Sequence, residues 1–127
     1  MVDERLTLID TSLWIEALRS GGDEKDRATV QEILEAGSAA WCEIIAIELW
    51  NSAKGKRELD ALSHFQRAIP MLPISDEVWR EARSLATKAR SSGLSAPTVD
   101  IIIAACARHH NVHLAHKDRH LKLLMDL

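Results

Sequence analysis

Short apolar runs and longer segments with helical spacing alternate along the chain. The first run, residues 6–9, is almost wholly apolar, which is typical of a strand buried on both faces of a parallel sheet. Apolar side chains at helical spacing follow over residues 13–18. The start of the chain therefore predicts a buried strand that leads directly into a helix. Open α/β sheets have this arrangement, and they bind ligands outside the carboxyl ends of their strands.

The same alternation continues to the end of the sequence. Helical spacing, caps and glycine stops predict further helices between Asp23 and Gly37, over 43–54, over 58–69, between Ser75 and Gly93, between Ser95 and Asn111, and over 120–127. Short strands are expected at 39–42, 71–74 and 112–115, the second of them toward the sheet edge because of its proline. We therefore predict an α/β fold with a short parallel sheet of about four to five strands flanked by helices.

The composition is that of one globular domain. Hydrophobic residues make up 46% and charged residues 28% of the 127 positions, which excludes wholesale disorder, and we expect residues 1–127 to form a single domain. No apolar run approaches the roughly 18 residues of a membrane span, and the acidic N-terminus does not resemble a signal peptide. We expect a cytoplasmic protein, without a membrane partner, in which Cys42 and Cys106 are buried reduced thiols.

Four acidic residues occupy positions where ligand chemistry is expected. Asp10 and Asp118 each follow a predicted strand, and Asp100 lies in the first turn of an almost wholly apolar helix. Glu48 shares a helix face with two isoleucines. Each acid also has a purely structural interpretation. An aspartate at a helix start caps or stabilises that end, and a glutamate beside an apolar face can extend into solvent.

If the four acids lie close together, they can bind a metal ion. The carboxyl ends of parallel strands lie at one edge of a sheet, so Asp10 and Asp118 meet if their strands are neighbours. Carboxylates about 5 Å apart repel by roughly 3 kcal/mol per pair at an effective dielectric near 20, and their pKa values rise. Such a cluster persists only when it is protonated or bound to cations. Oxygen ligands suit Mg²⁺ or Mn²⁺, and these ions activate water for phosphodiester hydrolysis.

The motifs around these acids resemble those of PIN-domain ribonucleases, and specifically the small VapC-type toxins of prokaryotic toxin–antitoxin pairs. The matching pieces, in chain order, are Leu8-Ile9-Asp10-Thr11-Ser12, Ile47-Glu48-Leu49, Pro97-Thr98-Val99-Asp100 and His116-Lys117-Asp118-Arg119-His120. Each piece alone is common. Four pieces in the family's order, spread over essentially the whole chain, are fairly specific.

The resemblance implies a PIN-like three-layer fold and a Mg²⁺- or Mn²⁺-dependent endoribonuclease that acts as a toxin. It implies RNA as substrate, a cognate antitoxin protein as partner, and a homodimer. The acidic quartet that holds the metal and performs catalysis would be Asp10, Glu48, Asp100 and Asp118. Two hydroxyl residues of the first motif, Thr11 and Ser12, would orient a carboxylate or a metal-bound water.

The last motif departs from the family pattern at two positions. The family commonly has Thr or Ser two residues before the aspartate and an aromatic residue two after it, where this chain has His116 and His120. We take His116 as a substitute contact to substrate or water, and the role of His120 stays open. Five histidines fall between positions 109 and 120, but they lack an HExxH or paired Cys/His spacing, so a dedicated zinc site is not favoured.

The surroundings of the acids suggest where partners bind. Because the net charge of −3 provides no overall attraction to nucleic acid, RNA would be held by local basic residues near the acids. The candidates are Lys54, Lys56, Arg57, Lys117, Arg119 and Lys122. Together with the family resemblance, Trp14 and Trp50, on helices that border the proposed site, suggest a hydrophobic groove for an antitoxin segment, unless both rings belong to the core.

Two other functions remain open from the sequence alone. One is phosphatase or phosphotransfer chemistry on an Asp10 nucleophile, although a haloacid-dehalogenase-like enzyme would have a second aspartate in place of Ser12. The other is a non-catalytic binding module on the same scaffold. The presence of all four acids argues against the binding module, because lost activity usually shows as lost acids.

Overall fold

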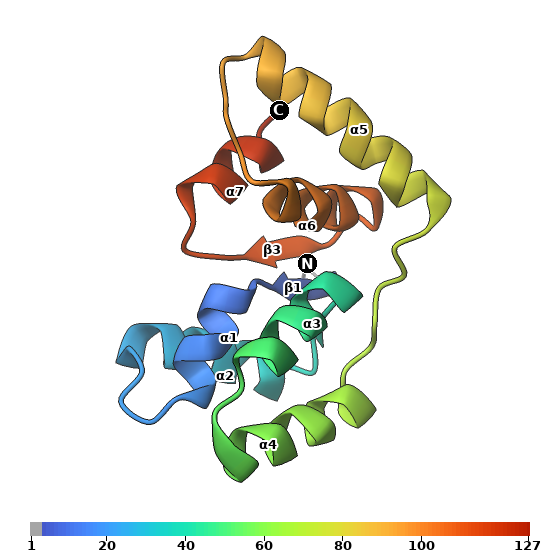
Figure 1. Ribbon diagram of the computed structural model, residues 1–127. Helices are drawn as coiled ribbons and strands as arrows, with labels where there is room; N and C mark the ends of the chain where they lie inside the picture. The colour runs from blue at the N-terminus through green and yellow to red at the C-terminus, as the bar shows by residue number, and fades with distance from the viewer. Residues whose placement is uncertain (1–3) are drawn as a thin grey trace.

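The computed structural model describes residues 4–127, which contain a small parallel sheet covered by helices (Figure 1). The strands are β1 (Thr7–Ile9), β2 (Ala39–Ala40) and β3 (His113–Ala115), in the spatial order β2-β1-β3. The helices are α1 (Thr11–Leu18), α2 (Glu24–Glu35), α3 (Glu43–Ser52), α4 (Gly55–Ala68), α5 (Asp76–Ser91), α6 (Thr98–His109) and α7 (Arg119–Met125). The predicted α/β class and the covering of the sheet by helices are confirmed.

The sheet is smaller than the sequence predicts, with three strands in the described part of the chain instead of four to five. The expected strand at 71–74 contributes only one parallel bridge, to Trp41. The Trp41 N–H donates to the Pro70 carbonyl at 3.1 Å, and the Leu72 N–H donates to the Trp41 carbonyl at 2.7 Å. Pro70 and Pro73 have no N–H to donate, so the ladder does not extend further.

One helix boundary also differs from its predicted position. Gly55 was expected to end the helix before it, with the next helix starting at 58, but α4 begins at Gly55 itself. Its φ of 78° lies in the left-handed region that favours glycine. This conformation lets the chain turn from α3 into α4 over only two intervening residues, Ala53 and Lys54.

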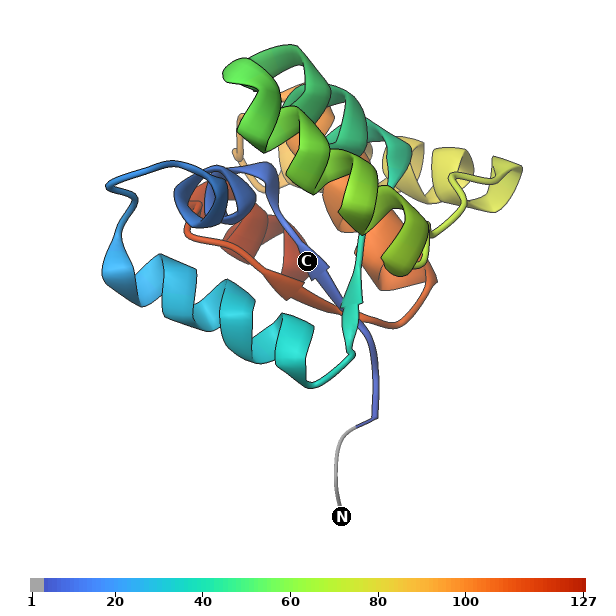
Figure 2. The same ribbon diagram turned by 90° about the horizontal axis from the view of Figure 1, so that it is seen from below.

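Helix α6 is the central helix, as its uniformly apolar sequence predicts. Ile103 and the four residues Ala104–Ala107 are buried, and α6 packs against α5, α7, α3 and β3. Figure 1 shows α5, α6 and α7 gathered on the β3 side of the molecule, with α1 to α4 on the other side. Figure 2 shows α2 and α4 on opposite sides of the strands. Among residues 4–127, no helix is both long enough and apolar enough to cross a membrane.

The sheet topology places two strand exits side by side. Strand β1 pairs in parallel with β3, from Thr7 opposite His113 to Ile9 opposite Ala115. The ladder continues one step beyond the strands, because the Asp10 N–H donates to the Ala115 carbonyl at 2.9 Å. Asp10 and the loop that follows β3 therefore leave the same edge of the sheet together, as expected for neighbouring parallel strands.

Candidate functional site

Asp10 sits where β1 ends and α1 begins, and it is only 7% exposed. It is the N-cap residue of α1. Its Oδ2 atom accepts hydrogen bonds from the Ser12 hydroxyl at 2.7 Å and from the Ser12 N–H at 3.4 Å. The capping interpretation is therefore correct, yet it leaves Oδ1 for another partner. A buried carboxylate with one oxygen held in place is oriented to use the other.

Glu48 is held against the start of α1. The Thr11 hydroxyl donates to Glu48 Oε1 at 2.6 Å, and the glutamate is half-buried on α3. The alternative, in which Glu48 extends freely into solvent from the edge of the apolar face, is wrong. Because Thr11 and Asp10 are adjacent, this hydrogen bond brings the α3 carboxylate next to the exit of β1.

Asp118 is fixed by the helix that follows it. As the N-cap of α7, its Oδ1 accepts hydrogen bonds from the N–H groups of His120 at 2.6 Å and Leu121 at 3.4 Å. The ring nitrogen Nδ1 of His120 lies 3.4 Å from the same oxygen. His116 accepts at Nδ1 from the Asp118 N–H at 3.3 Å, so this side of its ring faces the loop backbone.

The pKa of Asp100 is affected by all three of the other acids. Its pKa is raised, first by burial and then by the negative charges of Asp118, Asp10 and Glu48, while His120 acts in the opposite direction. Asp100 comes from the first turn of α6, and the other three acids come from α3 and the two strand exits. The structure thus brings the four predicted acids into one electrostatic environment.

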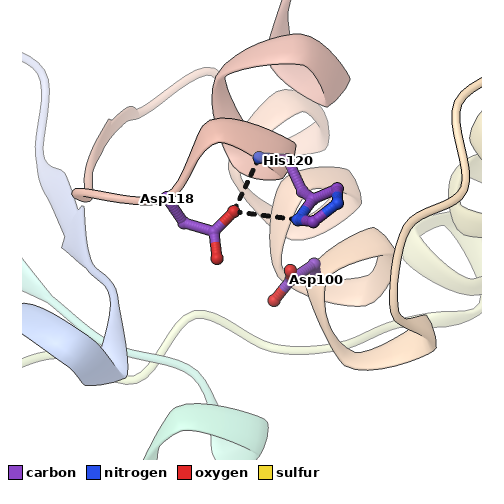
Figure 3. A group of neighbouring side chains, drawn as sticks. All are labelled: Asp100, Asp118 and His120. Atoms are coloured by element: carbon purple, nitrogen blue, oxygen red, sulfur yellow. Dashed lines mark hydrogen bonds and ion pairs between the residues drawn. The ribbon is translucent and has the colours of Figure 1, made fainter.

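Three of these side chains form a compact group of possible metal ligands. Asp100, Asp118 and His120 each offer a ligand atom, and these atoms lie within 4.8 Å of one another. Figure 3 shows the two carboxylates and the imidazole turned toward a common space between α6 and α7. The histidine was left open by sequence reasoning. The sequence does contain a clue to this contact. His120 is two residues after the N-cap aspartate, in the first turn of the helix, so its ring lies close to the Asp118 carboxylate.

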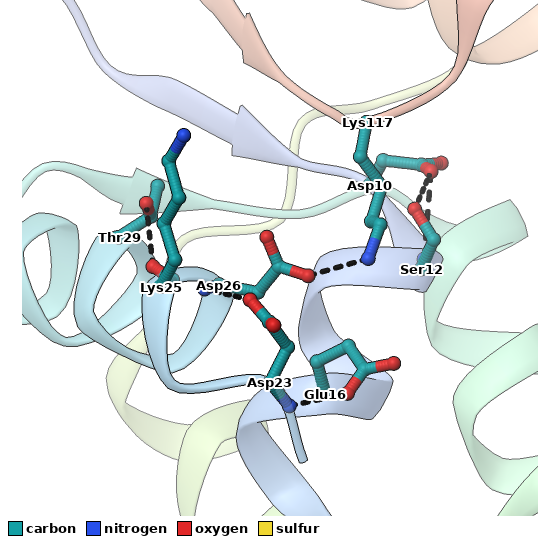
Figure 4. Close-up of polar contacts among 8 residues, drawn as sticks. All are labelled: Asp10, Ser12, Glu16, Asp23, Lys25, Asp26, Thr29 and Lys117. Atoms are coloured by element: carbon teal, nitrogen blue, oxygen red, sulfur yellow. Dashed lines mark hydrogen bonds and ion pairs between the residues drawn. The ribbon is translucent and has the colours of Figure 1, made fainter.

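One of the basic residues predicted to contact RNA forms an ion pair within the protein instead. Lys117 points away from the acids toward α2, where its Nζ pairs with Asp26 Oδ2 at 2.5 Å (Figure 4). This carboxylate raises the lysine's pKa, with further contributions from Glu16 and Asp23. The availability of Lys117 for RNA is therefore not supported by the structure.

Other basic candidates near the site are also partly engaged. Lys56 pairs with Asp60 at 2.7 Å in an exposed contact within α4, and Arg57 donates to the Leu18 carbonyl at 3.2 Å. Lys54, Arg119 and Lys122 are exposed. The basic candidates thus divide into side chains held by the protein and side chains that extend into solvent.

The two tryptophans that were expected to line a groove lie in different environments. Trp14 is fully buried, with its ring centroid 5.2 Å from that of Phe65 and 6.1 Å from that of Trp41. It belongs to the core, because a ring packed between two others has no free face. Trp50 is half-buried, and Ile47 on the same helix is 59% exposed. An apolar surface next to Glu48 therefore comes from α3 and not from α1.

Comparison with known proteins gives consistent matches. The PIN domain family model matches residues 7–125. Ribonuclease VapC11 of Mycobacterium tuberculosis and a VapC ribonuclease of Mycobacterium bovis are each 32% identical over 117 residues, which cover 89% of this chain and 87% of those proteins. Ribonuclease VapC21 of Mycobacterium tuberculosis is 29% identical over 96 residues, covering 73% of this chain and 70% of that protein.

Solved structures match over almost the full length. VapBC2 from Rickettsia felis, bound to a DNA fragment from its promoter, superimposes with a TM-score of 0.77 at 18% identity, covering 96% of this chain and 95% of that chain. FitAcB from Neisseria gonorrhoeae gives a TM-score of 0.73 at 18% identity, with coverage of 96% and 94%. At this identity the likeness concerns the fold.

Proposed function

The chain belongs to the PIN-domain family, and on that basis we propose that it is a metal-dependent endoribonuclease that acts as the toxin of a toxin–antitoxin pair. The observation that carries the proposal is geometric: Asp10 and the loop of Asp118 leave neighbouring parallel strands at one edge of the sheet, and ligand atoms of Asp100, Asp118 and His120 lie within 4.8 Å of one another. The raised pKa of Asp100, caused by burial and by the charges of Asp118, Asp10 and Glu48, agrees with this arrangement. Curated relatives named VapC ribonuclease, at 32% identity, support the assignment.

The residues at this place fit a divalent cation. Acids that repel one another in a partly buried space are stabilised by a bound positive charge. We propose that Asp10, Glu48, Asp100 and Asp118 hold the ion, and their oxygen atoms suit Mg²⁺ or Mn²⁺. When bound, such an ion lowers the pKa of a water molecule and stabilises the leaving oxygen of a phosphodiester.

Neighbouring residues would keep the carboxylates in position during this chemistry. Ser12 holds Oδ2 of Asp10 through two hydrogen bonds, and Thr11 holds Oε1 of Glu48. The start of α7 holds Oδ1 of Asp118. In each case one oxygen is fixed while the other is left to act, an arrangement that favours preorganised electrostatic catalysis. We propose His116 as a further contact to substrate or water.

RNA would approach this edge of the molecule along the basic side chains that extend into solvent. We propose Lys54, Arg119 and Lys122 as contacts to the RNA backbone, because none of them is among the engaged cations described above. Their attraction is local and opposes the overall charge of −3. Binding should therefore weaken steeply as the salt concentration rises.

The partner would be an antitoxin protein that covers the site. The similar structure from Rickettsia felis is that of VapBC2 bound to a promoter DNA fragment. On this chain, the exposed Ile47 lies next to Glu48 on α3, so a protein segment bound to this helix would also block the acids. We further propose that the chain acts as a homodimer and that residues 1–127 form one domain.

The decisive experiment measures cleavage of a fluorescently labelled RNA by the purified protein in Mg²⁺, in Mn²⁺ and in EDTA. Asp10→Asn and Asp100→Asn should each lower the cleavage rate by at least about a hundredfold, and EDTA should abolish cleavage. Asp76→Asn is the matched control, because Asp76 is an exposed aspartate in the first turn of α5. This variant should cleave RNA like wild type.

The same preparations should be tested on a phosphate monoester. Hydrolysis of the monoester without RNA cleavage would favour the phosphatase alternative. Full RNase activity in both site variants would contradict the assignment of these acids, and absence of any activity in the wild type would favour a binding module.

A further inference from the structure

His120 is oriented toward the two acids on the β3 side of the site. Its Nδ1 lies 3.4 Å from Asp118 Oδ1, and one ligand atom from each of Asp100, Asp118 and His120 lies within 4.8 Å of the others. Ligands at about 2.1 Å from one cation lie up to about 4.2 Å apart. The three side chains therefore have nearly the spacing of a coordination shell before any ion is bound (Figure 3).

The aspartate does not need the histidine as a hydrogen-bond donor. Asp118 Oδ1 already accepts two backbone N–H groups, from His120 and Leu121. At 3.4 Å the ring nitrogen is beyond the usual range of a charge-assisted hydrogen bond. The Nδ1 atom is therefore not committed to Asp118 and lies beside the space between the two acids.

The ring is also preorganised by the fold. His120 lies in the first turn of α7, and its backbone N–H is held by the N-cap aspartate at 2.6 Å. Only the two side-chain torsions of the histidine remain free, and little entropy is lost when they are fixed. The start of α7 thus delivers a carboxylate and an imidazole to the same place.

From this geometry we infer that His120 is a nitrogen ligand of the cation, and that it makes this site selective for transition-metal ions such as Mn²⁺ and Co²⁺ over Mg²⁺. The inference rests on the proposed metal-dependent function. Mg²⁺ strongly prefers oxygen ligands, whereas an imidazole nitrogen also binds Mn²⁺ and, more strongly, Co²⁺, in the Irving–Williams order. The histidine therefore adds a preference that the four acids alone do not provide.

A different role for the same ring makes the opposite prediction. If His120 were a protonated counter-ion of the acids, it would compete with any divalent cation for them. Removing it would then raise the affinity for every divalent ion. If it is a ligand, removing it lowers the affinity, and more so for Mn²⁺ and Co²⁺ than for Mg²⁺. The direction of the change separates the two roles without any measurement of activity.

The experiment titrates the purified full chain with Mg²⁺, Mn²⁺ and Co²⁺ by calorimetry, comparing wild type with His120→Gln and His120→Phe. We expect both variants to lose at least about tenfold in Mn²⁺ and Co²⁺ affinity, with a change of less than about threefold for Mg²⁺. His64→Gln is the matched control, since His64 is exposed on α4 and contacts Phe65. Circular dichroism of each variant checks that α7 still folds.

Pulsed electron paramagnetic resonance of the Mn²⁺-loaded protein supplies a direct readout. Wild type and the His64 control should show coupling of the metal to an imidazole nitrogen, and both His120 variants should lack it. Mn²⁺ bound without nitrogen coupling would overturn the role of His120 and leave the metal-dependent nuclease standing. A wild-type protein that binds none of the three ions would overturn both proposals.

Discussion

The carboxyl group of Asp100 is subject to two opposing effects. It lies in the first turn of α6, where the helix N-terminus attracts negative charge and lowers a carboxyl pKa by an interaction of typically about 0.3–1 kcal/mol. Burial and the charges of Asp118, Asp10 and Glu48 act in the other direction, and the pKa is raised. Desolvation and repulsion therefore outweigh the helix at this residue.

This balance predicts the effect of removing the charge. The folded-state pKa of Asp100 lies above its unfolded value of about 3.9. The group therefore stabilises the fold below that value, and this stability is lost as pH rises through the folded pKa. At neutral pH in EDTA, Asp100→Asn should raise the free energy of unfolding by at most about 1 kcal/mol, since the group is only partly buried. Thermal melts from pH 4 to pH 8 measure the effect.

The control for this residue-scale prediction is again Asp76→Asn. This change removes an acid from the first turn of α5 but not from a cluster, so it should leave the protein equally or less stable. If Asp100→Asn also melts below wild type at neutral pH in EDTA, then Asp100 acts only as a helix-end residue.

At the scale of elements, an ion pair connects α2 to the loop that carries Asp118. It joins Lys117 to Asp26, and the aspartate side chain is 14% exposed and the lysine side chain 46% exposed. Figure 4 shows the lysine crossing beside Asp10 to reach the start of α2. The pair joins residues 91 positions apart and connects the loop between β3 and α7 to α2.

Removing the Lys117–Asp26 ion pair should make the Asp118 loop more mobile without unfolding the protein. We expect Lys117→Met to lower the affinity for Mn²⁺ by about twofold to fivefold, the range of a partly exposed ion pair, and Lys117→Arg to restore most of it. Lys25→Met is the control, since Lys25 is an exposed lysine one residue from Asp26. An unchanged affinity in Lys117→Met would mean that the loop is positioned by β3 and α7 alone.

The elements differ in how well the sequence predicts them, for physical reasons. Helices α5 and α6 are long, with periodic or uniformly apolar patterns, and both were predicted close to their observed bounds. The expected strand at 71–74 was not, because Pro70 before it and Pro73 within it limit how far the ladder extends. Tertiary contacts such as Thr11 to Glu48 depend on how α1 crosses α3, and local pattern contains no information about that crossing.

At the scale of the whole molecule, the acids of the site come from two groups of helices on opposite sides of the molecule. Asp10 caps α1 and Glu48 lies on α3, whereas Asp100 lies on α6 and Asp118 caps α7. Figure 1 shows α1 and α3 on one side of the molecule and α6 and α7 on the other. The convergence of the two strand exits was predictable, because parallel neighbours end at one edge. The acids of α3 and α6 were singled out from their apolar surroundings, and the family motifs assigned them to the same site. The charges around Asp100 agree with that assignment.

A cation bound between the two sides should stabilise the entire fold. At a Mn²⁺ concentration one hundred times the dissociation constant, the free energy of unfolding should rise by about 2.7 kcal/mol. Native-state hydrogen exchange should slow in α3 and in α6 alike. Protection confined to one of these helices would indicate that the ion contacts only that side, and Asp100→Asn should show a much smaller response in both.

The order of the strands has a consequence for the timing of biosynthesis. The central strand β1 is made first, yet its partner β3 follows more than one hundred residues later, with Thr7 paired to His113. A nascent chain that has not reached β3 already contains Asp10, Glu48 and Asp100, but it lacks both the neighbouring strand and Asp118. We therefore expect the proposed nuclease to be inactive during its own translation, so that the messenger RNA and the ribosome that produce it are not exposed to it until synthesis has passed the last motif.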